Sequence, residues 1–201
     1  MPLTPSGARP SPLRPLALAL LLAAACAPPL AGCAGKGTPP IASLSAHDPL
    51  YGAPAWALGD CHAFFGADGA RLCGVGAMAG TRNVSLARTA AIGRARVSIG
   101  RTLEAKLVAM LNEHAATPEG AEIAARPDRE QYLRDVARQI SDAALPSTTL
   151  DDSWVGQDGT LYTLVSLDAD HFEDALARIA GLSEPLRAAV QSRARASFAQ
   201  R

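Results

Sequence analysis

The chain has 201 residues, with 19 lysines and arginines against 19 aspartates and glutamates. This balance excludes the strongly basic surface of most nucleic-acid-binding proteins, so we expect no nucleic-acid partner. The length is enough for one folded domain with a hydrophobic core, preceded by a shorter segment of different composition.

Residues 1–32 have the composition of a secretory signal peptide. Arg9 and Arg14 precede an apolar run over residues 16–25, and no acidic residue occurs before Cys33. The run is shorter than the roughly 20 apolar residues that a membrane-spanning helix needs. At its end, Leu30-Ala31-Gly32-Cys33 resembles the signal of bacterial lipoproteins. In those proteins a diacylglycerol is attached to the cysteine, the chain is cut before it, and the new amino terminus is acylated with a fatty acid such as palmitate.

The signal therefore predicts that Cys33 is the lipidated first residue of the mature protein. Cys26 is a weaker candidate because no branched apolar residue stands three positions before it. Two or three acyl chains, at about 0.8 kcal/mol per buried CH₂ group, make such an anchor durable. Ala34 follows Cys33 where retention in the inner membrane typically requires aspartate, so we expect the outer membrane, with the domain facing the periplasm or the surface.

Residues 33–53 are predicted to form the lipidated terminus and a flexible linker, because Gly, Pro, Ser and Ala dominate and no apolar periodicity is present. Residues 54–201 are predicted to form a single domain. The chain from Cys33 onward carries 17 basic and 19 acidic residues.

The domain begins with a predicted β-hairpin. Apolar stretches at residues 57–65 and 70–76 flank Asp68-Gly69, and Asp-Gly between two such stretches is typical of a hairpin turn. Cys61 and Cys73 lie nearly equidistant from this turn, which in an exported protein predicts a disulfide between them. His62 beside Cys61 leaves a metal site as the alternative, but no Cys-x₂-Cys spacing supports it, and we expect neither a metal nor a cofactor.

A long amphipathic helix is predicted from Val84 to Ala115, with Asn83 as its N-cap. Its apolar face recurs at helical spacing and is expected to pack on the sheet; the members are Ile92, Ile99, Leu103, Leu107, Met110 and His114, joined by Ala91 and Ala95. The opposite side carries Arg94, Arg101, Glu104 and Asn112.

Three further helices and a second hairpin follow. A capping box at residues 128–131 begins a helix that ends before Pro146, and residues 148–155 and 160–167 flank a Gly156–Gly159 turn. Asp170 and Glu173 form a second capping box for a helix over residues 172–180, and Ser183 caps a last helix over residues 184–198. We therefore expect an α+β fold, in which two hairpins form an antiparallel sheet and the helices pack on one face.

Two motifs could be taken for ligand sites. Gly74, Gly76 and Ala79 match the G-x-G-x-x-A fingerprint of dinucleotide-binding proteins, but the following helix is too long for a crossover and no parallel strand follows it. The acidic run from Asp168 to Asp174 could bind a cation, but capping of the following helix explains it better. No nucleophile elbow or zinc-protease motif occurs, so we expect no catalytic residue and no enzymatic activity.

Four short motifs, taken together, resemble the small antigenic outer-membrane lipoproteins of Helicobacter and their flagellar basal-disc relatives. They are Pro54-Ala55-Trp56, Gly74-Val75-Gly76, the spacing of Ala87, Ala91 and Ala95-Arg96, and Trp154 followed by residues 159–165. They span residues 54–181. The resemblance implies an α+β domain and a role in envelope or flagellum-associated assemblies. Cys61, Cys73 and the Arg-rich C-terminal helix depart from the family.

Two functions are consistent with these features. The first is a structural lipoprotein that forms homo-oligomers, because arginines near the long helix could pair head-to-tail with aspartates near the second hairpin, and because two hairpins leave sheet edges. The arginines are Arg82, Arg88, Arg94, Arg96 and Arg101, and the aspartates are Asp151, Asp152, Asp168 and Asp170. The second is a periplasmic or surface-exposed module that binds another envelope or flagellar protein, or peptidoglycan.

Overall fold

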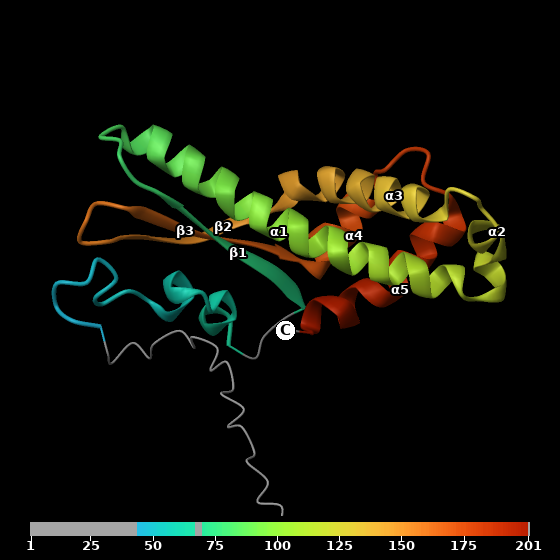
Figure 1. The fold of residues 1–201 in the computed structure, drawn as a ribbon, viewed down its shortest axis with the longest axis horizontal. Helices are drawn as coiled ribbons and strands as arrows, with labels where there is room; N and C mark the ends of the chain where they lie inside the picture. The colour runs from blue at the N-terminus through green and yellow to red at the C-terminus, as the bar shows by residue number, and fades with distance from the viewer. Residues whose placement is uncertain (1–43, 67–69, 201) are drawn as a thin grey trace, which may run out of the picture. The chain divides into compact units, whose positions relative to one another are not determined.

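The computed structural model describes residues 44–66 and 70–200, all of which belong to one compact unit, Thr38–Arg201 (Figure 1). The predicted α+β fold is confirmed. Its strands and α-helices are β1 (Arg71–Met78), α1 (Val84–Ala115), α2 (Ala121–Ala124), α3 (Arg129–Ala144), β2 (Thr149–Val155), β3 (Leu161–Asp168), α4 (Ala169–Ala177) and α5 (Glu184–Ala199). Short 3₁₀ helices are η2 (Ala55–Leu58), η3 (Cys61–Phe64), η4 (Pro118–Gly120) and η5 (Leu145–Ser147).

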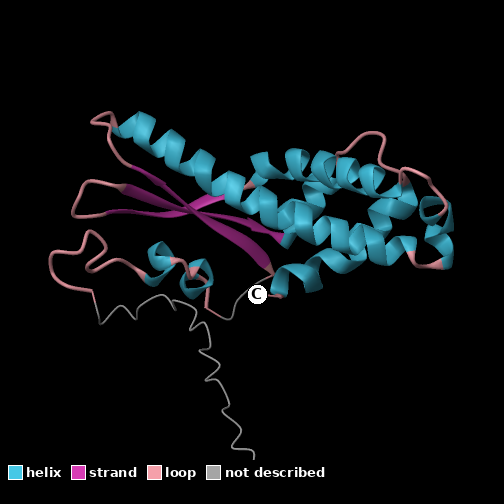
Figure 2. Ribbon diagram, viewed as in Figure 1, coloured by secondary structure: helices cyan, strands magenta, loops and turns pink. Residues whose placement is uncertain are grey.

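The three strands form an antiparallel sheet in the order β1-β3-β2 (Figure 2). β2 and β3 are the second predicted hairpin, which is confirmed, with Val155 opposite Leu161 next to the turn. β1 pairs along its whole length with β3, from Arg71 opposite Asp168 to Met78 opposite Leu161. The central strand therefore comes from the C-terminal half of the chain.

The first predicted hairpin is wrong, because the strand expected at residues 57–65 does not form. Residues 55–64 form η2 and η3 instead. Gly59 has a φ of 110°, in the left-handed region, and the carboxylate of Asp60 accepts a hydrogen bond from the backbone N–H of Ala63 at 3.2 Å. These two local turns end the extended path that the apolar pattern predicted, and β3 takes the position beside β1.

The first half of α1 lies directly against β1 because two glycines in the strand leave room for its backbone. A Cβ atom at Gly76 would lie 1.9 Å from the carbonyl oxygen of Ala91, and one at Gly74 would lie 2.6 Å from that of Ala95. Ala91 and Ala95 are themselves fully buried. The glycines that match a dinucleotide fingerprint thus serve the packing of a helix on a strand.

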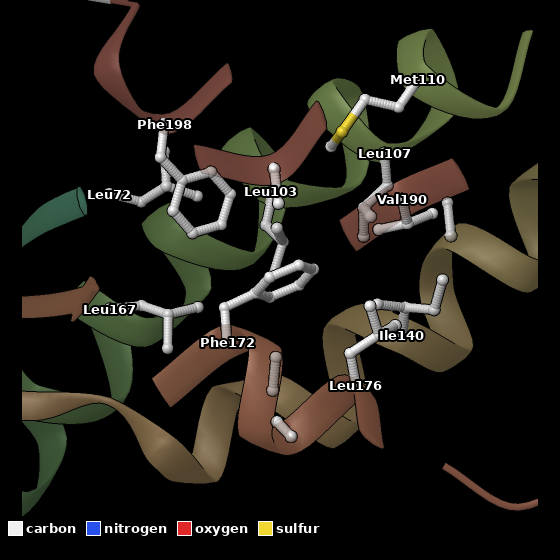
Figure 3. Packing of buried hydrophobic residues seen from close by; sticks show 14 of the residues in the cluster. Leu72, Leu103, Leu107, Met110, Ile140, Leu167, Phe172, Leu176, Val190 and Phe198 are labelled. Atoms are coloured by element: carbon white, nitrogen blue, oxygen red, sulfur yellow. The ribbon is translucent and has the colours of Figure 1, made fainter. Parts of the chain in front are cut away.

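The second half of α1 continues past the sheet and packs with α3 and α5, and α4 packs in turn on α3 and α5 (Figure 1). Figure 3 shows this core, in which Leu103 and Leu107 of α1 lie among side chains from the other helices. Phe172 of α4 and Phe198 of α5 have ring centroids 5.1 Å apart. The predicted apolar face of α1 is buried from Ile99 to His114, whereas Ile92 is only partly buried.

The other face of the sheet is covered by residues that precede β1. Trp56 of η2 is 2% exposed, and its indole N–H donates to the carboxylate of Asp152 on β2 at 3.1 Å. Residues 44–53, which fall within the predicted linker, form hydrogen-bonded turns, and the Pro49 carbonyl accepts from the Gln157 N–H at 3.3 Å. The rest of that linker lies outside the described residues.

Two helix starts differ in detail from the predictions. α4 begins at Ala169, because the carboxylate of Asp168, rather than that of Asp170, accepts the capping hydrogen bond from the His171 N–H at 2.8 Å. Asp128 precedes α3 as predicted, but its carboxylate pairs with Arg126 at 3.0 Å and makes no capping hydrogen bond. A side-chain partner nearby can thus replace the cap that a sequence motif predicts.

The packing of α1 gives a direct test of the assigned face. Ile99 is 0% exposed and lies under Gly74, so Ile99→Asp buries an unpaired carboxylate and should lower the free energy of unfolding by at least about 3 kcal/mol. Arg101 is exposed and has no side-chain partner among the described residues, so Arg101→Asp should change the free energy of unfolding by less than about 0.5 kcal/mol. Urea unfolding followed by circular dichroism measures both, and equal values would mean that the face is wrongly assigned.

Candidate functional site

Two of the three predicted site residues lie in the described part of the chain. Cys33 lies outside it. Cys61 and Cys73 are joined by a disulfide, with the sulfur atoms 1.98 Å apart and the Cα atoms 5.9 Å apart, which confirms the predicted pair. Cys61 lies in η3 rather than in a strand, so the disulfide ties a 3₁₀ helix to β1.

The alternative metal site uses the same atoms. A ring nitrogen of His62 and the sulfur atoms of Cys61 and Cys73 lie within 4.8 Å of one another, and no other group of three such ligands is found in residues 44–66 and 70–200. A metal needs thiolates as ligands, and a disulfide offers none. Disulfide formation and metal binding at this point of the molecule therefore exclude each other.

The acidic run after β3 is occupied by contacts within the domain. The second carboxylate oxygen of Asp168 lies 2.7 Å from Nδ1 of His171. Burial alone would raise the pKa of Asp168, but hydrogen bonds from the backbone and ring of His171 outweigh it and lower the pKa. Arg195 of α5 pairs with Asp170 at 2.5 Å and with Glu173 at 3.3 Å. These carboxylates cap α4 and join it to α5.

Asp151 lies at the point where the register of β2 with β3 shifts. The shift falls between Leu150 and Asp152, and the side chain of Asp151 lies near Ser166 and Arg71. Burial raises the pKa of Asp151, against the opposing effects of the Ser166 hydroxyl and the Arg71 guanidinium. Arg71 also lies over the ring of Phe65, 4.4 Å from its centroid.

The aspartates that the sequence suggested for a head-to-tail contact are therefore already engaged. Asp152 accepts from Trp56, Asp168 caps α4, and Asp170 pairs with Arg195. Asp170 is paired with a guanidinium and the other two carboxylates are held by hydrogen-bond donors of the same copy, so they are poor partners for arginines of a second copy.

A groove of about 630 Å³, which was not predicted from the sequence, lies between α1 and α3. Ala105 and Val108 of α1 and Leu133 of α3 give it an apolar floor. Its charged rim consists of Arg101, Glu104, Arg129, Glu130 and Arg134. Arg129 donates to the side-chain oxygen of Asn112 at 3.3 Å, and Arg134 lies 3.8 Å from Glu130. Arg101 and Glu104 have no side-chain partner within the described ranges.

The sequence held a partial signal for this groove. Ala105 and Val108 stand on the side of α1 away from its core-facing stripe, where a fully solvated helix would carry charged residues. Which helix lies opposite depends on the tertiary packing, and α3 could not be placed there from periodicity alone.

Comparisons with known proteins give no relative: no family model, no curated protein and no solved structure matches the chain. Within the described ranges, no helix is both long enough and apolar enough to span a membrane.

The disulfide gives a second test. Alkylation of the native protein without a reductant should leave Cys61 and Cys73 unlabelled, and mass spectrometry of the peptides measures this. Replacing both by alanine should lower the free energy of unfolding by about 3 kcal/mol, because the unfolded chain then regains the conformational entropy that closing this short loop removes. Full labelling of both thiols in the native protein would contradict the disulfide and favour metal binding with His62.

Proposed function

We propose that this chain is a structural lipoprotein anchored in the outer membrane through Cys33. The main support for this proposal is the sequence Leu30-Ala31-Gly32-Cys33, which follows a short apolar run and precedes Ala34. The compact unit that follows has its own hydrophobic core, as a domain held outside the bilayer by acyl chains requires. Its setting is the cell envelope, and the resemblance in sequence adds a flagellum-associated assembly as one such setting.

Lipidation of Cys33 is tested on the protein purified from membranes. Mass spectrometry of its N-terminal peptide should give a chain that begins at Cys33 and carries diacylglycerol and a further acyl group. Cys33→Ala should move the protein out of the outer-membrane fraction, whereas Cys26→Ala should leave the fractionation unchanged. An unmodified peptide that begins elsewhere would contradict the anchor.

We further propose that anchored copies associate with one another, but through helix α1 rather than through the sheet edges. β1 and β2 are the edge strands. The register shift and the aspartates of β2 are features that blunt an edge. On the β1 side, the guanidinium of Arg94 donates to the carbonyl of Ala77 near the end of the strand. Pairing of strands between copies is therefore poorly supported.

The outer face of α1 offers a better surface. Val97 is 53% exposed, and a Cβ atom at Gly93, one turn earlier, would meet nothing within 4 Å. A glycine inside a helix costs about 1 kcal/mol relative to alanine, and nothing within one copy requires it here. An antiparallel contact of two α1 helices, about a twofold axis that lies between Gly93 and Val97, would place Val97 of each copy against Gly93 of the other. Such an isologous contact closes as a dimer.

This association is tested by cross-linking in intact membranes and by light scattering of the detergent-extracted protein. The unchanged chain should give a dimer, and Val97→Arg should shift it to the monomer, because the new charges would repel across the twofold axis. Phe64→Arg, at a site that is 46% exposed in η3, is the matched control and should keep the dimer. A monomer in every form of the protein would contradict self-association.

The groove between α1 and α3 favours a second function, that of a binding module for another envelope protein or for peptidoglycan. Its apolar floor and its unpaired Arg101 and Glu104 are the features of a surface that can hold an extended polar ligand. A pull-down from membranes separates the two functions, since the first returns only this chain and the second returns a distinct partner.

A further inference from the structure

One end of the sheet collects exposed apolar side chains. The strand register places Met78, Val155 and Leu161 together at this end. Val155 is 59% exposed there, and Val84 and Leu86, which begin α1 after the turn that follows β1, are 70% and 54% exposed. Figure 1 shows the β1–α1 turn, the β2–β3 turn and the first described residues of the chain at the same end.

Tyr51 joins this group through the backbone. The Gln157 N–H in the β2–β3 turn donates to the Pro49 carbonyl, which holds residues 48–51 beside that turn. Tyr51 is 49% exposed. Among the described residues, four of the seven exposed large hydrophobic side chains thus lie at one end of the sheet, whereas Phe64 lies in η3, which packs near the start of β1. Soluble surfaces usually scatter such side chains, and their collection marks an interaction surface.

The chain enters the domain at this same end. Eleven residues lead from Cys33 to Leu44, the first described residue. A trans polypeptide spans at most about 3.6 Å per residue, so these residues reach no further than about 40 Å. A bilayer that holds acyl chains on Cys33 therefore stands within that distance of Leu44, where the described part of the domain begins.

The charge at this end favours lipid phosphates. Arg82 and Arg88 are exposed, flank Val84 and Leu86, and have no side-chain partner in the described structure. Four arginines and no acidic residue occur between Val84 and Leu103. The nearby carboxylates accept hydrogen bonds from neutral donors, Asp48 from the Leu50 N–H and Asp158 from the N–H and hydroxyl of Thr160, and they do not pair with the two arginines. Arginine binds phosphate oxygens with charge-assisted hydrogen bonds, and anionic lipid surfaces attract it.

We propose that this end of the domain, made of Tyr51, Val84, Leu86 and Val155 with Arg82 and Arg88, docks on the surface of the membrane that holds the anchor. The apolar side chains enter the boundary between headgroups and acyl chains, and the two arginines bind phosphates of anionic phospholipid. This inference rests on the proposed lipid anchor. Docking turns the α1–α3 groove, which lies beyond the sheet at the helical end, away from the bilayer and toward soluble partners.

Brominated lipid, which quenches tryptophan at short range, provides the test. The full-length acylated protein is reconstituted in vesicles of phosphatidylethanolamine and phosphatidylglycerol, with and without brominated phosphatidylglycerol. Three variants carry one added tryptophan: Val84→Trp and Val155→Trp at the docking end, and Phe64→Trp as the matched exposed control. The signal of Trp56 and Trp154 is subtracted with the parent protein, and thermal unfolding confirms that each variant is folded.

The added tryptophans at positions 84 and 155 should lose about half of their emission or more, and the one at position 64 should lose almost none, because only the first two reach the acyl boundary. Combining Arg82→Gln and Arg88→Gln with Val84→Trp should reduce the ratio of docked to undocked protein about 30-fold. Protein that floats with the vesicles but shows equal quenching at the three positions, or none, overturns the docking and leaves the anchor intact. Protein that does not float with the vesicles lacks the anchor, which overturns the proposed function and this inference together.

Discussion

The fold depends on the close approach of the backbone of α1 to that of β1. At each point of close approach a glycine of β1 faces an alanine of α1. Gly76 lies against Ala91, and Gly74 lies against Ala95. Because packed interiors tolerate few voids and few clashes, this contact fixes the direction of α1 across the sheet. The remaining length of the helix then extends past the strands, and α3, α4 and α5 complete a core on it that the small sheet could not provide.

A consequence is that the domain has two halves with different chemistry at their surfaces. The sheet half exposes aliphatic and aromatic side chains next to the entry of the chain, whereas the helical half exposes charged side chains around an apolar groove. The single helix α1 runs through both halves. The sheet end and the groove are consequently held on one continuous rigid element, so that the orientation of one determines the orientation of the other.

The sequence predicted the structure correctly where a periodic pattern extends over many residues, and incorrectly where a few local contacts determine the backbone conformation. Thirty-two residues of helical periodicity and the Asn83 cap were enough to predict both ends of α1, because each turn repeats the same signal. Residues 57–65 have the apolar content of a strand, but the left-handed backbone of Gly59 and the capping hydrogen bond to Asp60 turn the chain there. Each of these two signals is carried by a single residue, so a pattern over several residues does not reveal it. Cys61 and Cys73 were paired correctly although the predicted hairpin between them is wrong, because they are only 12 residues apart and the chain has only two other cysteines. The groove was missed because it belongs to two helices separated in sequence.

The disulfide also determines how the domain carries mechanical load. A force along the chain from its amino-terminal side first reaches the residues before Cys61, which are held on the sheet by non-covalent contacts such as the Trp56 hydrogen bond to Asp152. Beyond Cys61 the covalent link passes the force directly to Cys73, opposite Ser166 in the register of β1 with β3. The load then acts on a strand that is paired along its full length and covered by α1, so its hydrogen bonds share the force. A pull on the amino-terminal side can therefore extend the short entry segment while the folded domain stays closed.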